Sequence, residues 1–391
     1  MQKKVFLISE YYRAEQNTTG YLLEKLCSAL ENDSEIDLTL LVKEDLSFSK
    51  QQNAFYVKAG EKNKSSLLKR LIYELRLSFG FLRQSWKYIQ KDHIVFTGTT
   101  PIFLLPIVVI LKKIIGFQWI LLVHDVFPEN LVPAQIVKPN NIWYKILKQI
   151  FDYIYGQAEK VIVIGKDMQD LVYSKTKKNN IDIVQNWIDA SDIAIQEKSN
   201  NSILQEIGWA NSQEIIFYYF GNIGRMQGID IILNAITKMK YSSQAKFIFI
   251  GTGAYIKNLQ DKIKYMNNPN IIYYGYVSQA NRSDGLNAGD IALVTLTDGM
   301  LGLGVPSKSY FTMAANKPIF AIMDNNSEII DMIKQHNIGW YADNNEENIA
   351  QKLDLIIEKF NEYQLNSPRE ILEKFYSEKE LIGKVINIIK K

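Results

Sequence analysis

Three glycine-rich turns in the second half of the chain carry residue types that can hold a diphosphate. They are residues 221–228, which include Arg225, then Gly251-Thr252-Gly253, and residues 302–308, which end in Ser307 and Lys308. Backbone N–H groups in such turns and nearby cations bind phosphate oxygens. Because a single turn of this kind commonly serves only as a tight connection, the prediction depends on all three occurring together. Their spacing fits neither the Walker A motif nor Gly-x-Gly-x-x-Gly, so we expect a nucleoside diphosphate held by a different set of loops.

The elements that must position these turns alternate between strand and helix patterns, which is typical of βαβ units and parallel sheets. Strands are predicted at 5–8, 36–42, 94–96, 119–123 and 161–164, and again at 215–219, 247–250, 271–273, 291–294 and 319–321. Helices are predicted at 21–30, 143–155 and 377–391. Ligands of open α/β sheets bind beyond the carboxyl ends of the strands, so the three turns are expected to converge on one sheet edge.

The predicted fold class is α/β, with two Rossmann-like doubly wound domains facing across a cleft. The boundary is placed near Asn186 because the following residues, through Asn201, are polar and lack apolar periodicity. We expect a first domain at 1–188, a second at 189–376, and a C-terminal helix at 377–391 that packs back on the N-terminal domain.

The composition indicates a large globular protein and excludes several classes. The 391 residues are 47% hydrophobic and 22% charged, with a net charge of only +3, which argues against disorder and against a general nucleic-acid surface. One cysteine and three histidines exclude a disulfide framework and make a multi-histidine metal centre improbable. The longest apolar run, 102–111, contains Pro106 and is too short to span a bilayer, so we expect a cytoplasmic protein.

The order of motifs resembles retaining glycosyltransferases of the GT-B fold, specifically family 4. In the second half the resemblance includes the turns at 221–224 and 251–253, Tyr274-Gly275-Tyr276-Val277, Ala288-Gly289-Asp290, and Val305-Pro306-Ser307-Lys308. In the first half it includes Asn17-Thr18-Thr19-Gly20, His124-Asp125-Val126-Phe127-Pro128-Glu129, and Asn186-Trp187-Ile188-Asp189. The Asp-x-x-Pro-Glu and Val-Pro-Ser-Lys pieces are similar to the branch that contains bacterial capsule, O-antigen and colanic-acid transferases.

The resemblance implies a hexosyl- or N-acetylhexosaminyl-type enzyme. It would move a sugar from a nucleotide-diphosphate sugar, expected to be a UDP-sugar, to a saccharide or polyprenyl-diphosphate-linked saccharide in surface polysaccharide synthesis, with retention. The first domain would bind the acceptor and the second the nucleotide sugar. Negative charge grows on the leaving phosphate, so preorganised cations stabilise the transition state. No Asp-x-Asp is present, and we expect no metal and no required cofactor.

The expected site residues follow from the matched motifs. The catalytic residues are expected to be His124, Asp125, Arg225 and Lys308. The nucleotide sugar is expected to contact Gly20, Gly221, Asn222, Gln227, Gly253, Tyr276, Val277, Gly302, Leu303, Gly304, Val305, Pro306 and Ser307, and Glu10 is expected to face the acceptor. A histidine at a strand end is structural about as often as functional, so both interpretations of His124 stay open.

A basic amphipathic segment lies between residues 64 and 91. Seven basic residues, among them Lys64, Arg76, Arg83 and Lys87, accompany one acidic residue, Glu74. Apolar residues recur at helical spacing, at Leu68, Leu71, Ile72, Leu75, Phe79, Leu82 and Trp86. Two interpretations remain: a peripheral contact with anionic lipid on the inner face of the cytoplasmic membrane, or a core-packing helix with a solvated basic face. No stacking platform for nucleic acid accompanies the charge.

Two other functions fit the same fold. A non-hydrolysing nucleotide-sugar epimerase would need several acidic and histidine side chains around the anomeric carbon, and the chain offers few. The second alternative is a non-catalytic glycosyltransferase-like subunit, which the absence of a family motif would indicate. The family commonly has a Glu-x7-Glu element, and with its second position placed at Lys308 the first falls at Met300, so neither position is acidic.

Overall fold

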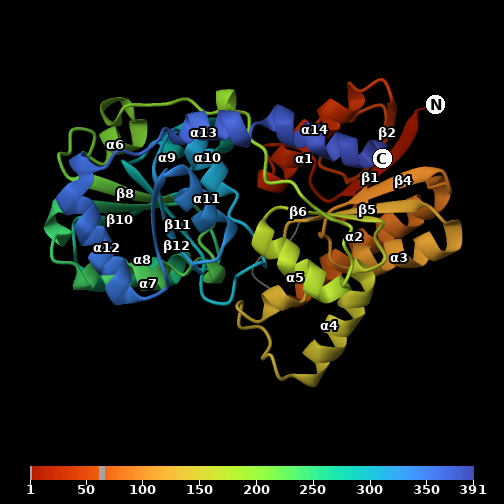
Figure 1. Ribbon diagram of the computed structural model, residues 1–391, viewed down its shortest axis with the longest axis horizontal. Coiled ribbons are helices and arrows are strands. Elements are labelled where there is room, and N and C mark those ends of the chain that lie inside the picture. The colour runs from red at the N-terminus through yellow and green to blue at the C-terminus, as the bar shows by residue number, and fades with distance from the viewer. Residues whose placement is uncertain (1, 61–66) are drawn as a thin grey trace. The chain divides into compact units, whose positions relative to one another are not determined.

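The computed structural model (Figure 1) describes residues 2–60 and 67–391, so Lys64 of the basic segment lies outside the described residues. The chain divides into two compact units. Unit 1 contains Met1–Asn186, Gly302–Gly304 and Glu378–Lys391, and unit 2 contains Trp187–Leu301 and Val305–Ser377. The division falls two residues before the expected boundary because Trp187 and Ile188 are buried and Ile188 forms a bridge with Ser377 of unit 2.

Unit 1 is built on one sheet of seven parallel strands in the order β3-β2-β1-β4-β5-β6-β7. The strands are β1 (Lys3–Ser9), β2 (Ile36–Lys43), β3 (Ala54–Val57), β4 (His93–Thr97), β5 (Gln118–Val123), β6 (Lys160–Val163) and β7 (Ile181–Ile183). Five of the seven begin or end within a few residues of a predicted strand. The prediction missed β3 and β7, which form the two edges of the sheet, are short, and bury only one residue each.

Helices cover both faces of this sheet. They are α1 (Thr18–Glu31), α2 (Leu67–Tyr88), α3 (Leu104–Ile115), α4 (Ile142–Tyr155), α5 (Lys166–Thr176) and α14 (Glu378–Lys390), with the short 3-10 helix η1 (Glu129–Leu131). The strand order reverses direction between β1 and β4, and crossovers are right-handed, so α1 lies on one face and α2 to α5 on the other (Figure 1). On the first face α14 packs against α1, and on the second α2, α3, α4 and α5 contact one another in sequence.

Unit 2 is a second doubly wound domain, with six parallel strands in the order β10-β9-β8-β11-β12-β13. The strands are β8 (Ile215–Phe220), β9 (Ala245–Ile250), β10 (Ile271–Gly275), β11 (Ile291–Thr295), β12 (Ile319–Ile322) and β13 (Gly339–Ala342). All but β13 were predicted, and the prediction of two doubly wound α/β domains is confirmed. The helices are α6 (Ser202–Glu206), α7 (Ile229–Lys238), α8 (Ile256–Met266), α9 (Arg282–Leu286), α10 (Lys308–Ala314), α11 (Glu328–His336), α12 (Glu346–Lys359) and α13 (Pro368–Phe375). Short 3-10 helices are η2 (Ala190–Asp192), η3 (Lys198–Asn200), η4 (Arg225–Gln227), η5 (Ser242–Gln244), η6 (Gln279–Asn281) and η7 (Phe360–Glu362).

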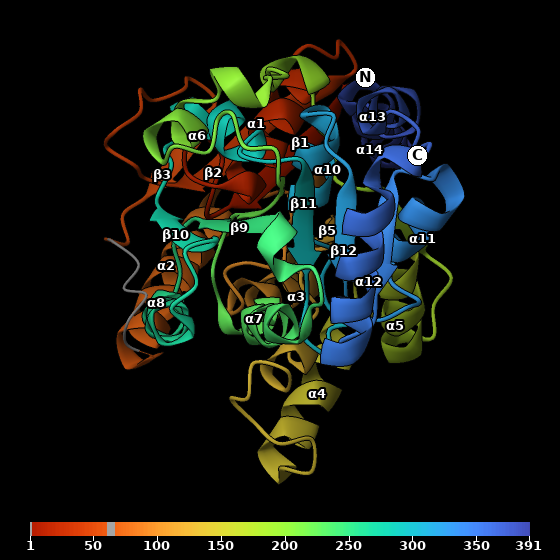
Figure 2. The same ribbon diagram turned by 90° about the vertical axis from the view of Figure 1, so that its left-hand side faces the viewer.

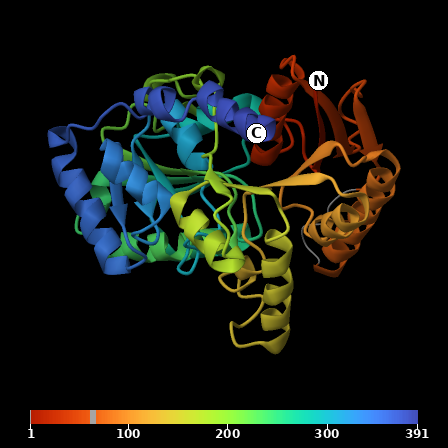
Figure 3. The same cartoon turned by 45° about the vertical axis from the view of Figure 1, so that its right-hand side comes forward.

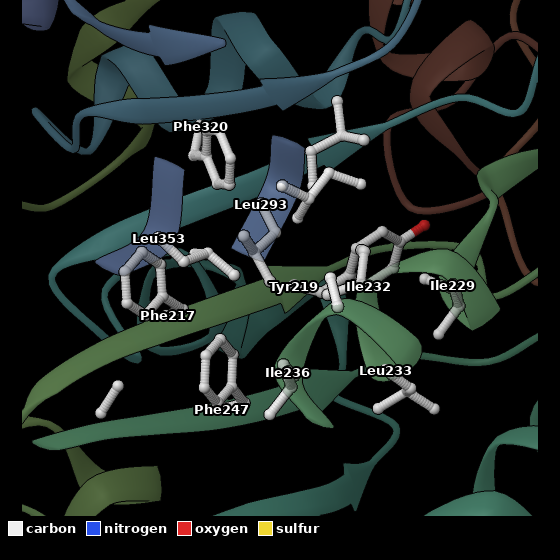
Figure 4. Packing of buried hydrophobic residues seen from close by; sticks show 14 of the residues in the cluster. Phe217, Tyr219, Ile229, Ile232, Leu233, Ile236, Phe247, Leu293, Phe320 and Leu353 are labelled. Atoms are coloured by element: carbon white, nitrogen blue, oxygen red, sulfur yellow. The ribbon is translucent and has the colours of Figure 1, made fainter. Parts of the chain in front are cut away.

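The core of unit 2 forms because alternate residues of its strands face opposite helix layers. Phe217 stacks on Phe247 with ring centres 5.2 Å apart, and both lie with Leu353 of α12 in one buried cluster (Figure 4). Helices α7, α8 and α12 lie on that face, and α6, α10 and α13 on the other (Figure 2). The segment expected to be a linker, through Asn201, instead forms η2 and η3 and leads into α6, whose first turn Asn201 caps.

Candidate active site

The strand order of unit 2 changes direction between β8 and β11, which is where ligands of such sheets bind. The loops that follow these two strands are joined. The Thr297 N–H donates to the Met226 carbonyl at 2.9 Å, and the Thr295 hydroxyl donates to the Gln227 carbonyl. A Cβ at Gly228 would lie 3.6 Å from Thr297 Cα, so the loop after β8 is held directly against the loop after β11.

The second glycine turn supports the first. The Gly221 N–H donates to the Ile250 carbonyl at 3.0 Å, and the Ile223 N–H donates to the Thr252 carbonyl at 2.7 Å. A Cβ at Gly251 would lie only 1.8 Å from the Gly221 carbonyl oxygen, and one at Gly253 only 2.1 Å from that of Ile223. Gly251 and Gly253 are therefore required for the close approach of two loops, which is a packing role.

The side chain of Lys308 lies beside the glycine turn at residues 221–228. Lys308 is the first residue of α10, and its Nζ lies 3.7 Å from the centre of the Tyr219 ring at the end of β8. A Cβ at Gly221, where φ is 141°, would lie 3.9 Å from Lys308 Cδ. Tyr219 is fully buried, and its hydroxyl, visible at the edge of the cluster in Figure 4, donates to the Asn222 carbonyl at 2.6 Å. Tyr219 thus connects the amine to the turn.

The Lys308 amine has no hydrogen-bond partner although its Nζ is buried. An aromatic face offers a cation about 0.5–2 kcal/mol. The desolvation of an unpaired ion costs on the order of several kcal/mol, which is more than the ring supplies. The burial accordingly lowers the pKa of Lys308 from 10.5 to about 7. An anion bound beside the amine would restore its charge, so the site is poised to accept one.

The other expected residues of unit 2 differ in exposure. Asn222, Arg225 and Tyr276 are exposed, while Gln227, Val277, Pro306 and Ser307 are half-buried and Val305 is buried. The Gln227 side chain already accepts the Gly224 N–H at 3.0 Å, which fixes the shape of the first turn. Arg225 therefore supplies a second cation at the solvent side of that turn.

Three expected nucleotide-sugar residues lie in unit 1. Leu303 accepts the Val126 N–H at 3.0 Å, Gly304 forms an antiparallel bridge with Asp125, and the Gly302 N–H donates to the Asp167 carboxylate at 3.2 Å. A side chain at Gly302 would meet the Asp167 carbonyl at 2.7 Å. These contacts build the three residues into the first unit, although their neighbours in sequence belong to the second.

His124 and Asp125 follow β5 in unit 1. The Nε2 atom of His124 is buried without a hydrogen-bond partner, and burial lowers the pKa of the imidazole to about 4. His124 is therefore neutral at physiological pH and has one ring nitrogen available to a ligand. Asp125 is exposed.

Two other expected residues of unit 1 are already engaged by the protein. Glu10 is fully buried and accepts the Tyr73 hydroxyl at 2.8 Å. Gly20 lies in the first turn of α1, where its N–H donates to the Asn17 side chain at 2.8 Å and where a Cβ would lie 2.1 Å from the Arg13 carbonyl oxygen. Gly20 thus has a packing role, and Glu10 anchors α2 to the end of β1.

Sequence reasoning missed two residues. The ring of Tyr219 contacts the Lys308 amine. Tyr219 belongs to an aromatic run that is typical of a buried strand, so its sequence context did not distinguish it from core residues. Lys175 binds Glu129 and Asp152 with Nζ–O distances of 2.5 and 2.6 Å and has a fully buried side chain. Lys175 of α5 therefore joins Asp152 of α4 to the Glu129 of the matched Asp-x-x-Pro-Glu motif. Among residues 2–60 and 67–391 no cluster of three or more His, Cys, Asp or Glu side chains could hold a metal ion.

Two doubly wound domains, with glycine turns and a buried amine at the switch point of the second, have the architecture of the GT-B fold. The sequence family of group 1 glycosyl transferases matches residues 202–368. The probable glycosyltransferase WbjE of Pseudomonas aeruginosa is 36% identical over 386 residues, which cover 96% of this chain and 94% of the relative. The chain belongs to the group 1 glycosyltransferase family, and it is a glycosyltransferase.

Solved structures support the fold over the whole length. Sucrose-phosphate synthase from Thermosynechococcus elongatus superposes with a TM-score of 0.77 at 12% identity, covering 100% of this chain and 98% of that one. Anabaena HepE in complex with UDP and glucose superposes with a TM-score of 0.72 at 13% identity, covering 100% of both chains. At these identities the likeness shows the fold alone.

Proposed function

We propose that the protein transfers a sugar from a UDP-sugar to a saccharide or polyprenyl-diphosphate-linked saccharide, as a family 4 enzyme of bacterial surface polysaccharide synthesis. The single observation that carries the proposal is the buried, unpartnered Lys308 amine beside the Gly221 turn. HepE, a relative in fold, was solved with UDP and glucose bound, which supports the choice of nucleotide. The motifs shared with capsule and O-antigen transferases support the choice of acceptor.

In this proposal unit 2 binds the donor and unit 1 the acceptor. The diphosphate lies against Lys308 and the turn after β8, with Arg225 at its outer side. As the anomeric C–O bond breaks, negative charge grows on the leaving phosphate, and these two cations stabilise it without a metal or another cofactor. The neutral His124 imidazole of unit 1 offers one ring nitrogen to a substrate hydroxyl. Asp125 helps to position the reactants.

The proposed reaction proceeds with retention of configuration. The acceptor oxygen attacks the anomeric carbon from the face that the diphosphate leaves, and its proton passes to the departing phosphate oxygen. No carboxylate nucleophile is needed in this mechanism. Following the anomeric proton coupling of the product by NMR tests the stereochemistry, and an inverted product would overturn retention.

A panel of UDP-sugars tests the function. The protein is incubated with each donor, with and without polyprenyl-diphosphate-linked glycans, and both UDP release and the donor's sugar are followed. Glycosylated acceptor is the expected product. Epimerised donor would support the epimerase, and nucleotide binding without turnover would support a non-catalytic subunit. Failure of every nucleotide to bind would overturn both enzymatic functions.

Membrane association is proposed through the basic side chains of α2. Arg76, Arg83 and Lys87 are exposed, and each basic residue near anionic lipid contributes about 1 kcal/mol. Six of the seven apolar residues of the sequence pattern are exposed as well, with Leu68 at 66% and Phe79 at 67%, whereas Tyr73, Leu77 and Phe81 are buried. A core-packing role for the predicted apolar stripe therefore does not fit. Among the described residues no helix is long and apolar enough to cross a bilayer.

Replacing Arg76, Arg83 and Lys87 together by Gln tests this contact. Sedimentation with phosphatidylglycerol vesicles at low salt is expected to fall at least tenfold. The matched control replaces Lys257, Lys264 and Lys359, which are exposed lysines of unit 2. Equal binding of the two triple variants would contradict a role for α2.

A further inference from the structure

The first nine residues of α4 bury none of their side chains, although they are largely apolar. Ile142 is 62% exposed and Trp143 is 75% exposed. The helix becomes buried only at Phe151, Ile154 and Tyr155. Figure 3 shows α4 extending away from the sheet of unit 1. Large exposed apolar side chains that are contiguous mark an interaction surface.

The exposed apolar residues of α4 form one stripe. Ile142, Ile146, Ile150 and Tyr153 recur at intervals of four, four and three residues, so they share a helix face. The neighbouring helix α3 extends it with Ile110 and Ile114, because Lys113 lies 5.2 Å from the centre of the Tyr153 ring and places the two helices side by side. We define the α4 face by the exposed residues Ile110, Ile114, Ile142, Trp143, Ile146, Ile150 and Tyr153.

The charges around the α4 face indicate what covers it. Lys113 and Lys145 are exposed beside it, and Lys138 is exposed in the loop that leads into α4. Helix α3 has no acidic residue, and the single acid of α4, Asp152, pairs with Lys148 at 2.7 Å and with Lys175 at 2.6 Å. A second copy of this chain would bring like charges together. An anionic bilayer complements both the lysines and the apolar stripe, and Trp143 suits the interface between lipid and water.

We propose that the α4 face inserts into the boundary between head groups and acyl chains of an anionic bilayer. This inference rests on the proposed membrane association and adds insertion by α4 to the electrostatic contact of α2. The ion pairs among Lys175, Glu129 and Asp152, together with buried Phe151, hold the inner end of α4 on unit 1. Insertion therefore fixes unit 1 on the membrane surface, where a lipid-linked acceptor is delivered.

Fluorescence quenching by brominated lipids tests the insertion directly. The full chain is mixed with vesicles of phosphatidylglycerol and brominated phosphatidylcholine, and the loss of tryptophan emission is measured. Quenching is expected from Trp143, so that Trp143→Phe removes most of it. The comparison is made in a Trp86→Phe background, because Trp86 is 58% exposed on α2, which is itself proposed to contact the membrane. Quenching that survives in Trp143→Phe would overturn the proposal.

A second pair of variants measures the contribution to binding. Ile146→Ser with Ile150→Ser is expected to weaken vesicle partitioning at least tenfold, also in 0.5 M salt, where electrostatic contacts are screened. The control is Ile195→Ser with Tyr265→Ser, two exposed residues of unit 2. Equal partitioning of both pairs would overturn insertion alone. Absence of vesicle binding by the wild type would overturn the proposed association as well.

Sedimentation in the absence of lipid separates self-association from insertion. A monomer at all concentrations is expected. A dimer of the wild type that the Ile146→Ser and Ile150→Ser changes dissociate would assign the α4 face to a second copy and contradict the proposal. Binding of UDP is measured in the variants of α4, and it is expected to stay unchanged because these changes lie in unit 1.

Discussion

Lys308 is the residue at which function and stability oppose each other. In the unfolded chain the pKa of this amine is 10.5, whereas burial in the folded state lowers it to about 7. Between these values the unfolded state binds more protons, so stability rises with pH there, and Lys308 destabilises the fold most below pH 7. Such a cost is typical of a binding site that waits for its ligand.

Replacing Lys308 by Met is therefore expected to stabilise the free protein at pH 7. Removal of an unpaired buried amine should raise the free energy of unfolding of unit 2 by roughly 1–3 kcal/mol. Thermal denaturation of the free protein checks this, with Lys317→Met, another lysine whose pKa is lowered by burial, as a comparison. A lower melting temperature for Lys308→Met would show that the amine contributes to the fold itself.

The affinity for UDP is expected to depend on pH through the same amine. Protonated Lys308 attracts the diphosphate, so affinity should fall by roughly tenfold or more between pH 6.5 and pH 8.5, as the amine loses its proton around its pKa of about 7. Arginine stays charged throughout this range. Calorimetric titrations of wild type and Lys308→Arg should give a sloping and a flat profile, and two parallel profiles would exclude Lys308 as the titrating group.

The sequence pointed to Lys308 because it ends a glycine-rich turn, but it contained no sign that the amine is buried. That property depends on Tyr219, about 90 residues earlier, and long-range packing leaves no local pattern. The same limit applies to Gly302, Leu303 and Gly304. Their sequence neighbours lie in unit 2, and only the contacts with Asp125, Val126 and Asp167 assign them to unit 1.

At the scale of elements, the two glycine turns of unit 2 form one support for the site. Gly251→Ala is expected to destabilise unit 2 by about 2–4 kcal/mol, because φ is 140° and the new methyl group would meet the Gly221 carbonyl oxygen. UDP binding should weaken as well, since the Gly221 turn would shift. Chemical denaturation and UDP titration check both effects.

Gly383 of α14 provides the control for the Gly251→Ala variant. Gly383 is helical, and a Cβ there would meet nothing within 4 Å. Gly383→Ala should therefore stabilise unit 1 by about 0.5–1 kcal/mol, in line with helix propensity, and leave UDP binding unchanged. If Gly251→Ala left the stability of unit 2 unchanged or raised it, as Gly383→Ala is expected to do for unit 1, the packing role of Gly251 would be wrong.

Strands buried on both faces were predictable, because runs such as that of β9 are continuous and apolar. The edge strands β3, β7 and β13 were not, since their short sequences are partly exposed and resemble loops. Helix α2 shows a different limit. The periodicity of apolar residues located an apolar stripe on this helix but did not show whether the stripe faces the core or solvent. The side that faces the core also includes the polar residues Glu74, Ser78 and Ser85.

At the scale of the whole molecule, unit 1 is discontinuous in sequence. Helix α14 comes from the C-terminus and buries Leu381, Ile382 and Val385 against unit 1, while Lys390 pairs with Asp33 at 2.8 Å. The sequence indicated an apolar face on this helix that must pack against something, and the contacts with α1 show what it covers.

Removal of residues 378–391 is expected to unfold unit 1 while unit 2 stays folded. Each buried aliphatic side chain contributes about 1.5–3 kcal/mol, so the loss exceeds the typical stability of a domain. Calorimetry of the truncated chain should show one transition in place of two, with UDP binding retained. Lys390→Ala, which removes only ion pairs at the surface of unit 1, should leave both transitions in place. Two intact transitions after truncation would contradict this account of unit 1.

The central claim is that the Lys308 amine binds the diphosphate of the donor, and calorimetric titration of UDP into the Lys308→Met variant at pH 6.5 tests it most directly. A hydrogen bond to a charged group contributes about 1.5–3 kcal/mol, so we predict that the dissociation constant rises at least tenfold. The variant should remain folded and at least as stable as the wild type. A dissociation constant within twofold of the wild-type value would contradict the claim.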